Sequence, residues 1–198
     1  MKTALLVIDL QRDFCPGGAL AVPEGDAIVP GVNALMHDFA EVVLTQDWHP
    51  AGHSSFASAH PGKAPFDTVA MDYGPQVLWP DHCVQGSAGA AFHPDLDTTR
   101  ANLVIRKGSN PAIDSYSAFF ENDRTTPTGL HGYLGERGIT DLVLVGLALD
   151  FCVQYSALDA ARLGYRVRVR RDLTRAIDLD GSCAAAQAAM RAAGVALG

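Results

Sequence analysis

The sequence predicts a single α/β domain over residues 1–198, with a three-layer, doubly wound fold in which helices cover both faces of a mainly parallel, six-stranded sheet. Two observations support this prediction. Short aliphatic runs alternate along the chain with segments of helical periodicity, as in βαβ units. Most of these runs are apolar throughout, which is typical of parallel strands covered on both faces. The length suits one such domain, and no repeat or linker divides the chain.

The expected strands are short. They lie at residues 4–8, 42–45, 103–105, 142–145 and 165–169, and a sixth is expected at 195–197. The first four runs are apolar throughout, so they are expected to be covered on both faces. In the fifth run, valines alternate with a set of arginines, namely Arg166, Arg168, Arg170 and Arg171. This pattern predicts an edge strand with one solvated face rather than an anion-binding site.

Four helices are expected between these strands, at residues 29–39, 130–137, 152–163 and 183–193. The first has Pro30 in its first turn, where proline is tolerated because its missing N–H would have no helical partner. Glycine follows each of the other three, at Gly138, Gly164 and Gly194, as is common just past the end of a helix.

Residues 48–101 do not fit the alternation of strands and helices. This segment is rich in Pro, Gly, His, Ser and Asp. It holds both tryptophans and five of the seven histidines, which are His49, His53, His60, His82 and His93. A long irregular segment inside a compact domain is usually functional or disordered. The composition favours an ordered, functional segment, and we expect a metal-binding region at about residues 47–101.

Composition and charge argue against several classes of protein. The net charge is −7 and the pI is near 5.3, so nucleic acid is not an expected partner. The longest aliphatic stretch, residues 142–149, is far too short to cross a bilayer, and no secretory signal is recognisable. The four cysteines form no C-x-x-C pair and are expected to be reduced thiols in the cytoplasm. No G-x-G-x-x-G or P-loop occurs, so no nucleotide cofactor is expected.

Polar residues follow the expected strands at their carboxyl ends. Asp9 follows the first strand, Asp47 and His49 follow the second, Lys107 follows the third, and Cys152 opens the helix after the fourth. In an open parallel sheet, ligands bind outside the carboxyl ends of the strands. Each residue alone could be a strand-end cap or a buried core residue, but their joint placement predicts a functional site.

Cys152 is the expected nucleophile of this site. It lies at a strand-to-helix turn, where backbone N–H groups and the helix dipole lower the pKa of a thiol, and Lys107 would favour the thiolate further. The same N–H groups could hold the oxyanion of a carbonyl under attack. Asp9 is expected to take the thiol proton and return it to a leaving amine. The remaining cysteines lack this setting and are interpreted as structural.

Asp47 and His49 form half of a candidate metal site, because residues two apart on an extended chain project from the same side. His82, within the motif W-P-D-H at 79–82, is the expected third ligand. One carboxylate and two imidazoles would leave coordination positions open for a substrate. His53 lies four residues beyond His49 and could also reach the ion. The alternative is that these histidines are surface loop residues that bind nothing.

The same residues carry a resemblance to the nicotinamidases, also called pyrazinamidases, within the isochorismatase-like cysteine hydrolases. It extends from residue 4 to about residue 194. The matching segments are V-I-D-L-Q-R-D-F-C at 7–15, G-G-A-L-A-V at 17–22, Q-D-W-H-P at 46–50, H-S-S-F-A at 53–57, W-P-D-H-C-V at 79–84, K-G at 107–108, D-S-Y-S-A-F-F at 114–120 and G-L-A-L-D-F-C-V at 146–153. A triad of Asp, Lys and Cys alone indicates only the superfamily, whereas the D-x-H and W-P-x-H-C motifs point to the nicotinamidase branch.

The resemblance implies the isochorismatase-like hydrolase fold and an enzyme that hydrolyses nicotinamide to nicotinate and ammonia, and pyrazinamide to pyrazinoate, in pyridine nucleotide salvage. It implies that Asp9, Lys107 and Cys152 carry the chemistry through a thioester on Cys152. It also implies a cis peptide bond between Leu147 and Ala148, which would aim the N–H groups of Ala148 and Cys152 at the oxyanion.

The resemblance further assigns the recognition of the substrate. Asp47, His49 and His82 would bind one divalent metal ion, for which zinc is the first choice and iron or manganese the alternatives, with His53 as an optional ligand. The residues around the substrate ring would be Phe14 and Trp79, which sandwich it, and Tyr116, which lines the same pocket. Leu149 departs from the family, which commonly has a small polar residue there, so fine specificity is less well defined than reaction class.

Other functions remain open at this point. A metal-bound water could attack the amide while Cys152 is only structural. The chain could also be another isochorismatase-like amidohydrolase, an isochorismatase, or a metal-dependent binding protein without turnover. Isochorismatase chemistry needs no metal anchor, so the three candidate ligands argue against it. The expected partner is a small aromatic amide; no nucleic acid or membrane partner is expected, and self-association is left open.

Overall fold

The computed structural model describes residues 2–198, and its centre is a six-stranded parallel sheet. The strands are β1 (Thr3–Ile8), β2 (Val42–Asp47), β5 (Leu103–Lys107), β6 (Asp141–Leu147), β7 (Arg166–Arg175) and β8 (Ala196–Leu197). Their order is β5-β2-β1-β6-β7-β8, and every neighbouring pair is parallel. The chain winds outward from β1 in one direction and then returns to β6 on its other side, as in a doubly wound sheet. The predicted fold class and the six predicted strands are confirmed.

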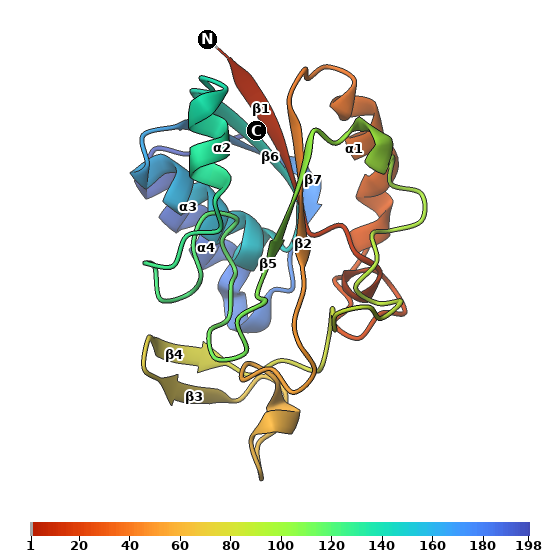
Figure 1. Ribbon diagram of the computed structural model, residues 1–198, viewed down its shortest axis with the longest axis vertical. Coiled ribbons are helices and arrows are strands. Elements are labelled where there is room, and N and C mark those ends of the chain that lie inside the picture. The colour runs from red at the N-terminus through yellow and green to blue at the C-terminus, as the bar shows by residue number, and fades with distance from the viewer. Residues whose placement is uncertain (1) are drawn as a thin grey trace.

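Helices cover both faces of this sheet. Figure 1 shows α1 (Val29–Met36) on one face and α2 (Leu130–Glu136), α3 (Gln154–Arg162) and α4 (Ser182–Ala192) on the other. The predicted end of the first helix at residue 39 is wrong, because the chain turns after Met36 in order to enter β2. Phe39 still packs against the core, which explains why its spacing looked helical.

The helix predicted from Cys152 is divided into two parts. Residues Leu149–Val153 form one π-helical turn, and α3 begins only at Gln154. Single π-helical turns are rare and are frequently found at functional sites. Cys152 therefore lies inside a wide turn that directly follows the buried strand β6, rather than at the first position of a regular helix.

Two predictions about the edges of the sheet are wrong. The run at 103–105 was expected to be covered on both faces, yet β5 is an edge strand and Val104 is 42% exposed. The arginine-bearing strand was expected at an edge, yet β7 lies between β6 and the short strand β8. Its alternating pattern of exposure does match the predicted solvated face, with Val167 and Val169 buried. Composition reports how apolar a strand is, and the number of neighbouring strands depends on the connections of the whole chain.

The segment predicted to be irregular is ordered by loop hydrogen bonds and one small hairpin. The hairpin, β3 (Thr68–Met71) and β4 (Gly74–Val77), is antiparallel and escaped the sequence analysis. It lies beyond the carboxyl ends of the main strands, apart from the sheet (Figure 1). Short 3₁₀ turns occur at Arg12–Phe14, Gly25–Ile28, Ala57–Ala59, Thr98–Arg100 and Leu179–Gly181.

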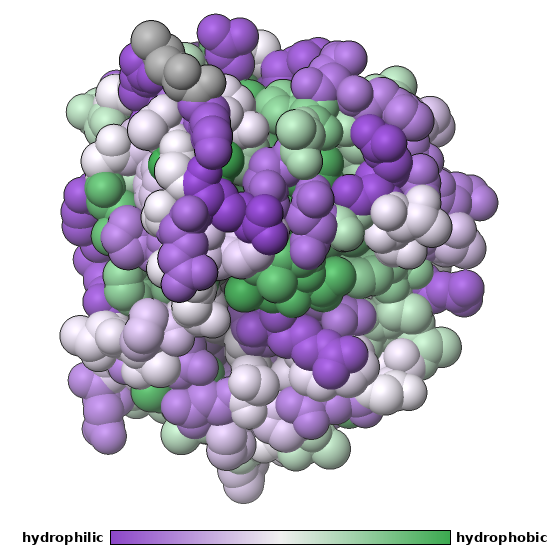
Figure 2. Space-filling model, turned by 45° about the horizontal axis from the view of Figure 1, so that its top comes forward, coloured by the Kyte–Doolittle hydropathy of each residue, from purple (hydrophilic) through white to green (hydrophobic). Residues whose placement is uncertain are grey.

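The core and the surface follow the expected distribution of polarity. Residues of β1 from Ala4 to Ile8 are at most 1% exposed, because helices cover the sheet on both faces. Figure 2 shows a mainly hydrophilic face with a small hydrophobic area near its centre. Within residues 2–198, no helix has the length and apolar character needed to cross a membrane.

Candidate active site

The structure brings Asp9, Lys107 and Cys152 together, although they come from three different segments. Asp9 follows β1, Lys107 ends β5, and Cys152 lies in the turn after β6. The ammonium Nζ of Lys107 lies 2.8 Å from Asp9 Oδ2 and 3.5 Å from Cys152 Sγ. All three side chains are buried, at 0%, 2% and 7% exposure respectively. The strand-end argument made from the sequence therefore predicted a real cluster.

Lys107 is held as a cation by two carboxylates. Besides Asp9, its ammonium contacts Asp47 Oδ1 at 3.0 Å and donates to the carbonyl oxygen of Ser115 at 2.8 Å. Burial lowers the pKa of Lys107, but the charges of Asp47 and Asp9 outweigh burial and hold that pKa well above its ordinary value. The lysine is therefore a permanent positive charge at this site rather than a proton donor.

The expected low pKa of the thiol is wrong for Cys152 as it lies here. Burial raises the pKa of Cys152 well above the usual value of a thiol; the Lys107 charge lowers it, and the Asp9 carboxylate raises it. Burial also raises the pKa of Asp9, against the opposing charge of Lys107. A thiol that holds its proton needs a base beside it, and Asp9 is a base strengthened by the same burial.

Thr45, in β2, positions Asp9 and was missed by the sequence analysis. Its hydroxyl donates to Asp9 Oδ1 at 2.6 Å and accepts the backbone N–H of Asp9 at 3.1 Å. One carboxylate oxygen of Asp9 is thus fixed by Thr45 while the other faces Lys107. Thr45 resembled an ordinary β-branched strand residue, and only the pairing of β1 with β2 brings it to Asp9.

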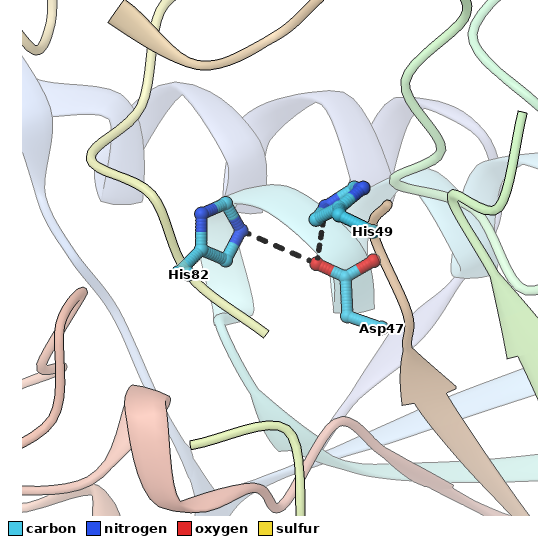
Figure 3. Close-up of side chains that lie close together, drawn as sticks. All are labelled: Asp47, His49 and His82. Carbon is cyan, nitrogen blue, oxygen red and sulfur yellow. Dashed lines mark hydrogen bonds and ion pairs between the residues drawn. The ribbon is translucent and has the colours of Figure 1, made fainter. Parts of the chain in front are cut away.

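Asp47, His49 and His82 also converge, as predicted. His49 Nε2 lies 3.0 Å and His82 Nε2 lies 3.3 Å from the same carboxylate oxygen, Asp47 Oδ2. Figure 3 shows the two imidazole rings directing these nitrogens at that oxygen from different segments of the chain. His49 is 0% and His82 is 3% exposed, so the alternative of surface loop histidines is wrong.

The donors and acceptors of this group suit a metal ion. His49 Nδ1 lies 2.9 Å from the carbonyl oxygen of Gly108, and His82 Nδ1 lies 2.8 Å from that of Pro80. A carbonyl oxygen only accepts, so each Nδ1 carries a proton, and in its neutral form each ring would present a lone pair on Nε2 to a carboxylate oxygen. Three acceptors facing one another repel unless a cation lies among them. The three ligand atoms lie within 4.8 Å of one another, close enough for one ion.

The pKa values of Asp47 and His49 reflect the same need for a positive charge among these side chains. Burial raises the pKa of Asp47, but the charges of His49 and Lys107 reverse this effect and hold it well below its ordinary value. Burial lowers the pKa of His49, while the Asp47 charge raises it, to about 8. Without a metal, a proton on the imidazole would supply the missing positive charge. The site therefore favours a cation, whether it is a proton or a metal.

Close approach of the backbone explains one glycine of this site. Gly108 has φ +68°, and a Cβ atom there would lie 2.5 Å from Cε1 of His49. A side chain at this position would push the His49 ring away from the carbonyl that fixes its tautomer. The motif K-G at 107–108 thus combines a charged residue with a residue that must remain small.

His53 lies beside the group and uses both ring nitrogens elsewhere. Its Nδ1 accepts the N–H of Ser55 at 3.1 Å, and its Nε2 lies 2.7 Å from the carbonyl oxygen of Asn110. Asp114 also lies beside the group, with Oδ1 3.8 Å from His49 Nε2. His49, His53 and Asp114 form a second set of side chains with metal-ligating atoms close together. Asp114 belongs to the motif D-S-Y-S at 114–117, which was the available signal for it.

A pocket adjoins both groups. Its lining includes the three residues that the resemblance places around the substrate ring, two of the metal group, and the thiol and cis-peptide residues: Phe14, Trp79, Tyr116, Asp47, His82, Cys152 and Ala148. Four further lining residues had no role assigned from the sequence: Leu20, Asp114, Phe151 and Ile177. Trp79, Tyr116 and Phe151 form one cluster, with the Trp79 and Phe151 ring centroids 4.9 Å apart, while the Phe14 ring contacts that of His82. The Leu147–Ala148 peptide bond is cis, as the resemblance implied.

The walls of this pocket are complementary in chemistry to a flat aromatic molecule with one polar substituent. Apolar and aromatic walls would hold its ring, and the thiol and the metal group would meet its polar atoms. The fold and this site together define a hydrolase of the isochorismatase class. The isochorismatase domain model matches residues 3–197, and the chain belongs to this family.

The most similar relatives define a narrower group. The chain is 55% identical to the nicotinamidase of Acinetobacter baylyi over 192 residues, which are 97% of this chain and 90% of that protein. It is 49% identical to the nicotinamidase of Escherichia coli, over 89% of this chain and 84% of that protein. A solved nicotinamidase/pyrazinamidase from Acinetobacter baumannii superposes with a TM-score of 0.98 at 54% identity, covering 99% of this chain and 95% of that one. Nicotinamidases are amidohydrolases.

Two further structures carry ligands. The pyrazinamidase of Pyrococcus horikoshii was solved with zinc, and it superposes with a TM-score of 0.80 at 35% identity over 100% of this chain and 99% of that one. The yeast nicotinamidase was solved with the inhibitor nicotinaldehyde, and it superposes with a TM-score of 0.92 at 30% identity over 98% of both chains. A divalent metal and a small pyridine compound are thus bound by proteins of this fold.

Proposed function

We propose that this protein is a metal-dependent nicotinamidase that hydrolyses nicotinamide, and also pyrazinamide, through a thioester on Cys152. The observation that carries the proposal is the placement of the Cys152 thiol and the Asp9 carboxylate around the ammonium of Lys107, at the side of an aromatic pocket. The identity to nicotinamidases over nearly the whole chain supports the same substrate. The four cysteines are unpaired, which fits the cytoplasm as its location.

In the first half of the reaction, Cys152 Sγ attacks the carboxamide carbon while Asp9 takes the thiol proton. Net charge is conserved, because Asp9 becomes a neutral acid as the new C–S bond forms and the negative charge passes to the oxygen of the former carbonyl. The backbone N–H groups of Ala148 and Cys152 would hold the oxyanion of the tetrahedral intermediate. The C–N bond then breaks, Asp9 gives its proton to the departing nitrogen, and ammonia leaves a thioester behind.

In the second half, Asp9 is again a base. It takes a proton from water, and the oxygen of that water attacks the thioester carbonyl. The C–S bond then breaks, the acid is released, and Cys152 recovers its proton from Asp9. Lys107 keeps one positive charge beside both residues throughout, since its pKa is held far above neutrality.

The metal group and the aromatic residues of the pocket are proposed to recognise the substrate. Asp47, His49 and His82 would hold the divalent ion, for which zinc is proposed, and the ion would offer a Lewis-acidic position to the ring nitrogen of the substrate. His53 is proposed to lie outside this ligand set, because both of its nitrogens have other partners. Phe14, Trp79 and Tyr116 are proposed to hold the ring, so that the carboxamide faces Cys152.

The experiment that tests the proposal is ammonia release from nicotinamide by wild type and the Cys152→Ala variant. The variant should bind nicotinate but release no ammonia above background. Cys183→Ala is the matched control, because Cys183 is a half-buried thiol on α4 and should leave the rate unchanged. Substantial turnover by Cys152→Ala would contradict the thioester and favour attack by metal-bound water. A wild-type protein that binds nicotinamide without releasing ammonia would contradict the enzymatic function itself.

A further inference from the structure

Gln76 is the buried residue of the β3–β4 hairpin, and the chemistry described above does not use it. Its side chain is 1% exposed, while the other residues of the two strands are exposed or half-buried. A glutamine on a small hairpin outside the main sheet would normally face water. Burial of its amide requires partners for both of its polar atoms.

The partners outside the hairpin lie in the segment that follows Lys107. Gln76 Nε2 lies 2.8 Å from Asp114 Oδ2, 2.9 Å from the Tyr116 hydroxyl and 2.7 Å from the carbonyl oxygen of Val77, so its two N–H groups serve three acceptors. Its Oε1 accepts from Asn122 Nδ2 at 3.2 Å and from the Tyr73 hydroxyl at 3.1 Å. The orientation of the amide is defined, because a carboxylate only accepts and Asn122 is itself fixed by the N–H of Tyr116, which donates to its Oδ1 at 3.0 Å.

Through Tyr116 the amide reaches the aromatic walls of the pocket. The Tyr116 hydroxyl also accepts from Trp79 Nε1 at 3.1 Å, so the polar edges of both rings meet at one oxygen. The two rings stand at 79° to each other with their centroids 6.1 Å apart. Gln76 itself does not line the pocket. It fixes the hydroxyl on which the angle between the two rings depends.

Through Asp114 the same amide reaches the metal group. Asp114 Oδ2 accepts from Gln76, and its Oδ1 lies 3.8 Å from Nε2 of His49. Asp114 is 2% exposed and lines the pocket. The Gln76 amide is thus hydrogen-bonded both to Asp114, beside His49, and to the hydroxyl of Tyr116, whose ring lies against Trp79.

We propose that Gln76 is a positioning residue for recognition of the substrate ring: it holds Tyr116 and Asp114 in place, and through them the slot that receives a pyridine-type carboxamide. This inference rests on the proposed function for the identity of that ring. None of the contacts of Gln76 involves Asp9, Lys107 or Cys152. Its removal should therefore weaken capture of the substrate and leave the reacting groups intact.

The test compares Gln76→Leu and Gln76→Glu with Gln85→Leu, a matched control whose exposed amide donates only to a loop carbonyl. Gln76→Leu leaves Asp114 Oδ2 without a donor, and Gln76→Glu places a second carboxylate against it. Loss of a buried hydrogen bond of this kind should raise KM for nicotinamide roughly tenfold, with kcat changed by less than about threefold. Gln85→Leu should behave as wild type.

Two further measurements separate positioning from loss of structure. In a Trp48→Phe background, Trp79 is the remaining tryptophan, and quenching of its fluorescence by nicotinate gives a dissociation constant without turnover. Alkylation of Cys152 by iodoacetamide should keep its wild-type rate in both Gln76 variants. In a double-mutant cycle, Gln76→Leu should raise KM less in a Tyr116→Phe background than in wild type, because the shared hydroxyl is already absent.

Unchanged KM and unchanged nicotinate binding in both Gln76 variants would overturn the inference. A decrease in kcat with no change in KM would overturn it as well. So would effects of Gln76→Leu and Tyr116→Phe on KM that are strictly additive in free energy. Failure of the proposed function has a different signature, since wild type would then release no ammonia. Nicotinate binding at Trp79 and its dependence on Gln76 can still be measured in that case, so the two conclusions can fail separately.

Discussion

Replacing Lys107 by Met removes the one cation that two buried carboxylates share. In wild type its ammonium lies 2.8 Å from Asp9 and 3.0 Å from Asp47, and it also donates to the carbonyl of Ser115 at 2.8 Å. Removing one partner of a buried ion pair costs roughly 3–5 kcal/mol. Leaving the Ser115 carbonyl without a donor adds roughly 1–3 kcal/mol. A loss of roughly 4–8 kcal/mol would be a large part of the total stability of a domain of this size.

The loss should depend on pH, with a defined sign. The pKa of Lys107 is raised in the folded protein, so the contribution of its charge is complete below its unfolded pKa and is lost only as pH rises through the folded pKa. In the variant, Asp9 keeps its burial and loses the opposing charge of Lys107, so its pKa rises further above the ordinary value of an aspartate. The folded variant then binds a proton that the unfolded chain does not, and its stability should recover as pH falls from 8 to 5.

The assay is urea unfolding of metal-free wild type, Lys107→Met and the double variant Asp9→Asn/Lys107→Met at pH 5 and pH 8. The double variant removes the carboxylate that lost its partner, so it should be more stable than Lys107→Met at pH 8 while remaining inactive. Equal free energies of unfolding for wild type and Lys107→Met at pH 8 would refute the assignment of Lys107 as a shared counter-ion. A double variant less stable than the single one would show that Asp9 is not the charge in need of compensation.

Two further results are expected from the same site. Asp9→Asn should keep nicotinate binding, measured by Trp79 quenching, and should lose roughly 10²–10⁴-fold in kcat, because both proton transfers pass through this carboxylate; a loss below about tenfold would assign them to another group. His82→Ala should lose most of its bound metal by elemental analysis, whereas His53→Ala should retain it, because both nitrogens of His53 have other partners. Equal losses in the two variants would make His53 a fourth ligand.

The arrangement of the sheet could be predicted largely because it is parallel. Strands buried on both faces leave unbroken aliphatic runs, and all six runs became strands of one sheet. The edges could not be predicted in this way. Val104 in β5 and Val43 in β2 belong to similar aliphatic runs, yet Val104 is 42% exposed and Val43 is 0% exposed. The difference lies in how many strands and helices surround each run, which depends on the connections of the whole chain.

The site could be predicted where its residues lie at strand ends, and not where they act through tertiary contacts. Asp9, Asp47 and Lys107 all directly end or follow a strand, so topology alone brings them to one edge. Gln76 and Thr45 have no such signal, since each matters only through the partner that folding brings to it. The predicted lowering of the Cys152 pKa was wrong for a related reason. The sequence shows a lysine that can lie nearby, but burial has the largest effect on this pKa, and burial is a property of the folded protein.

Asp47 joins the two halves of the site because its two oxygens serve different partners. Oδ1 lies 3.0 Å from Lys107 Nζ, in the group with Asp9 and Cys152, while Oδ2 faces the Nε2 atoms of His49 and His82. A cation bound among the imidazoles would therefore not need to displace Lys107 from the carboxylate. An asparagine at this position could not serve both sides, because its amide nitrogen would face either the ammonium or the cation as a second donor. The geometry thus requires a carboxylate at position 47, and a single buried side chain joins the group of Asp9, Lys107 and Cys152 to the two imidazoles.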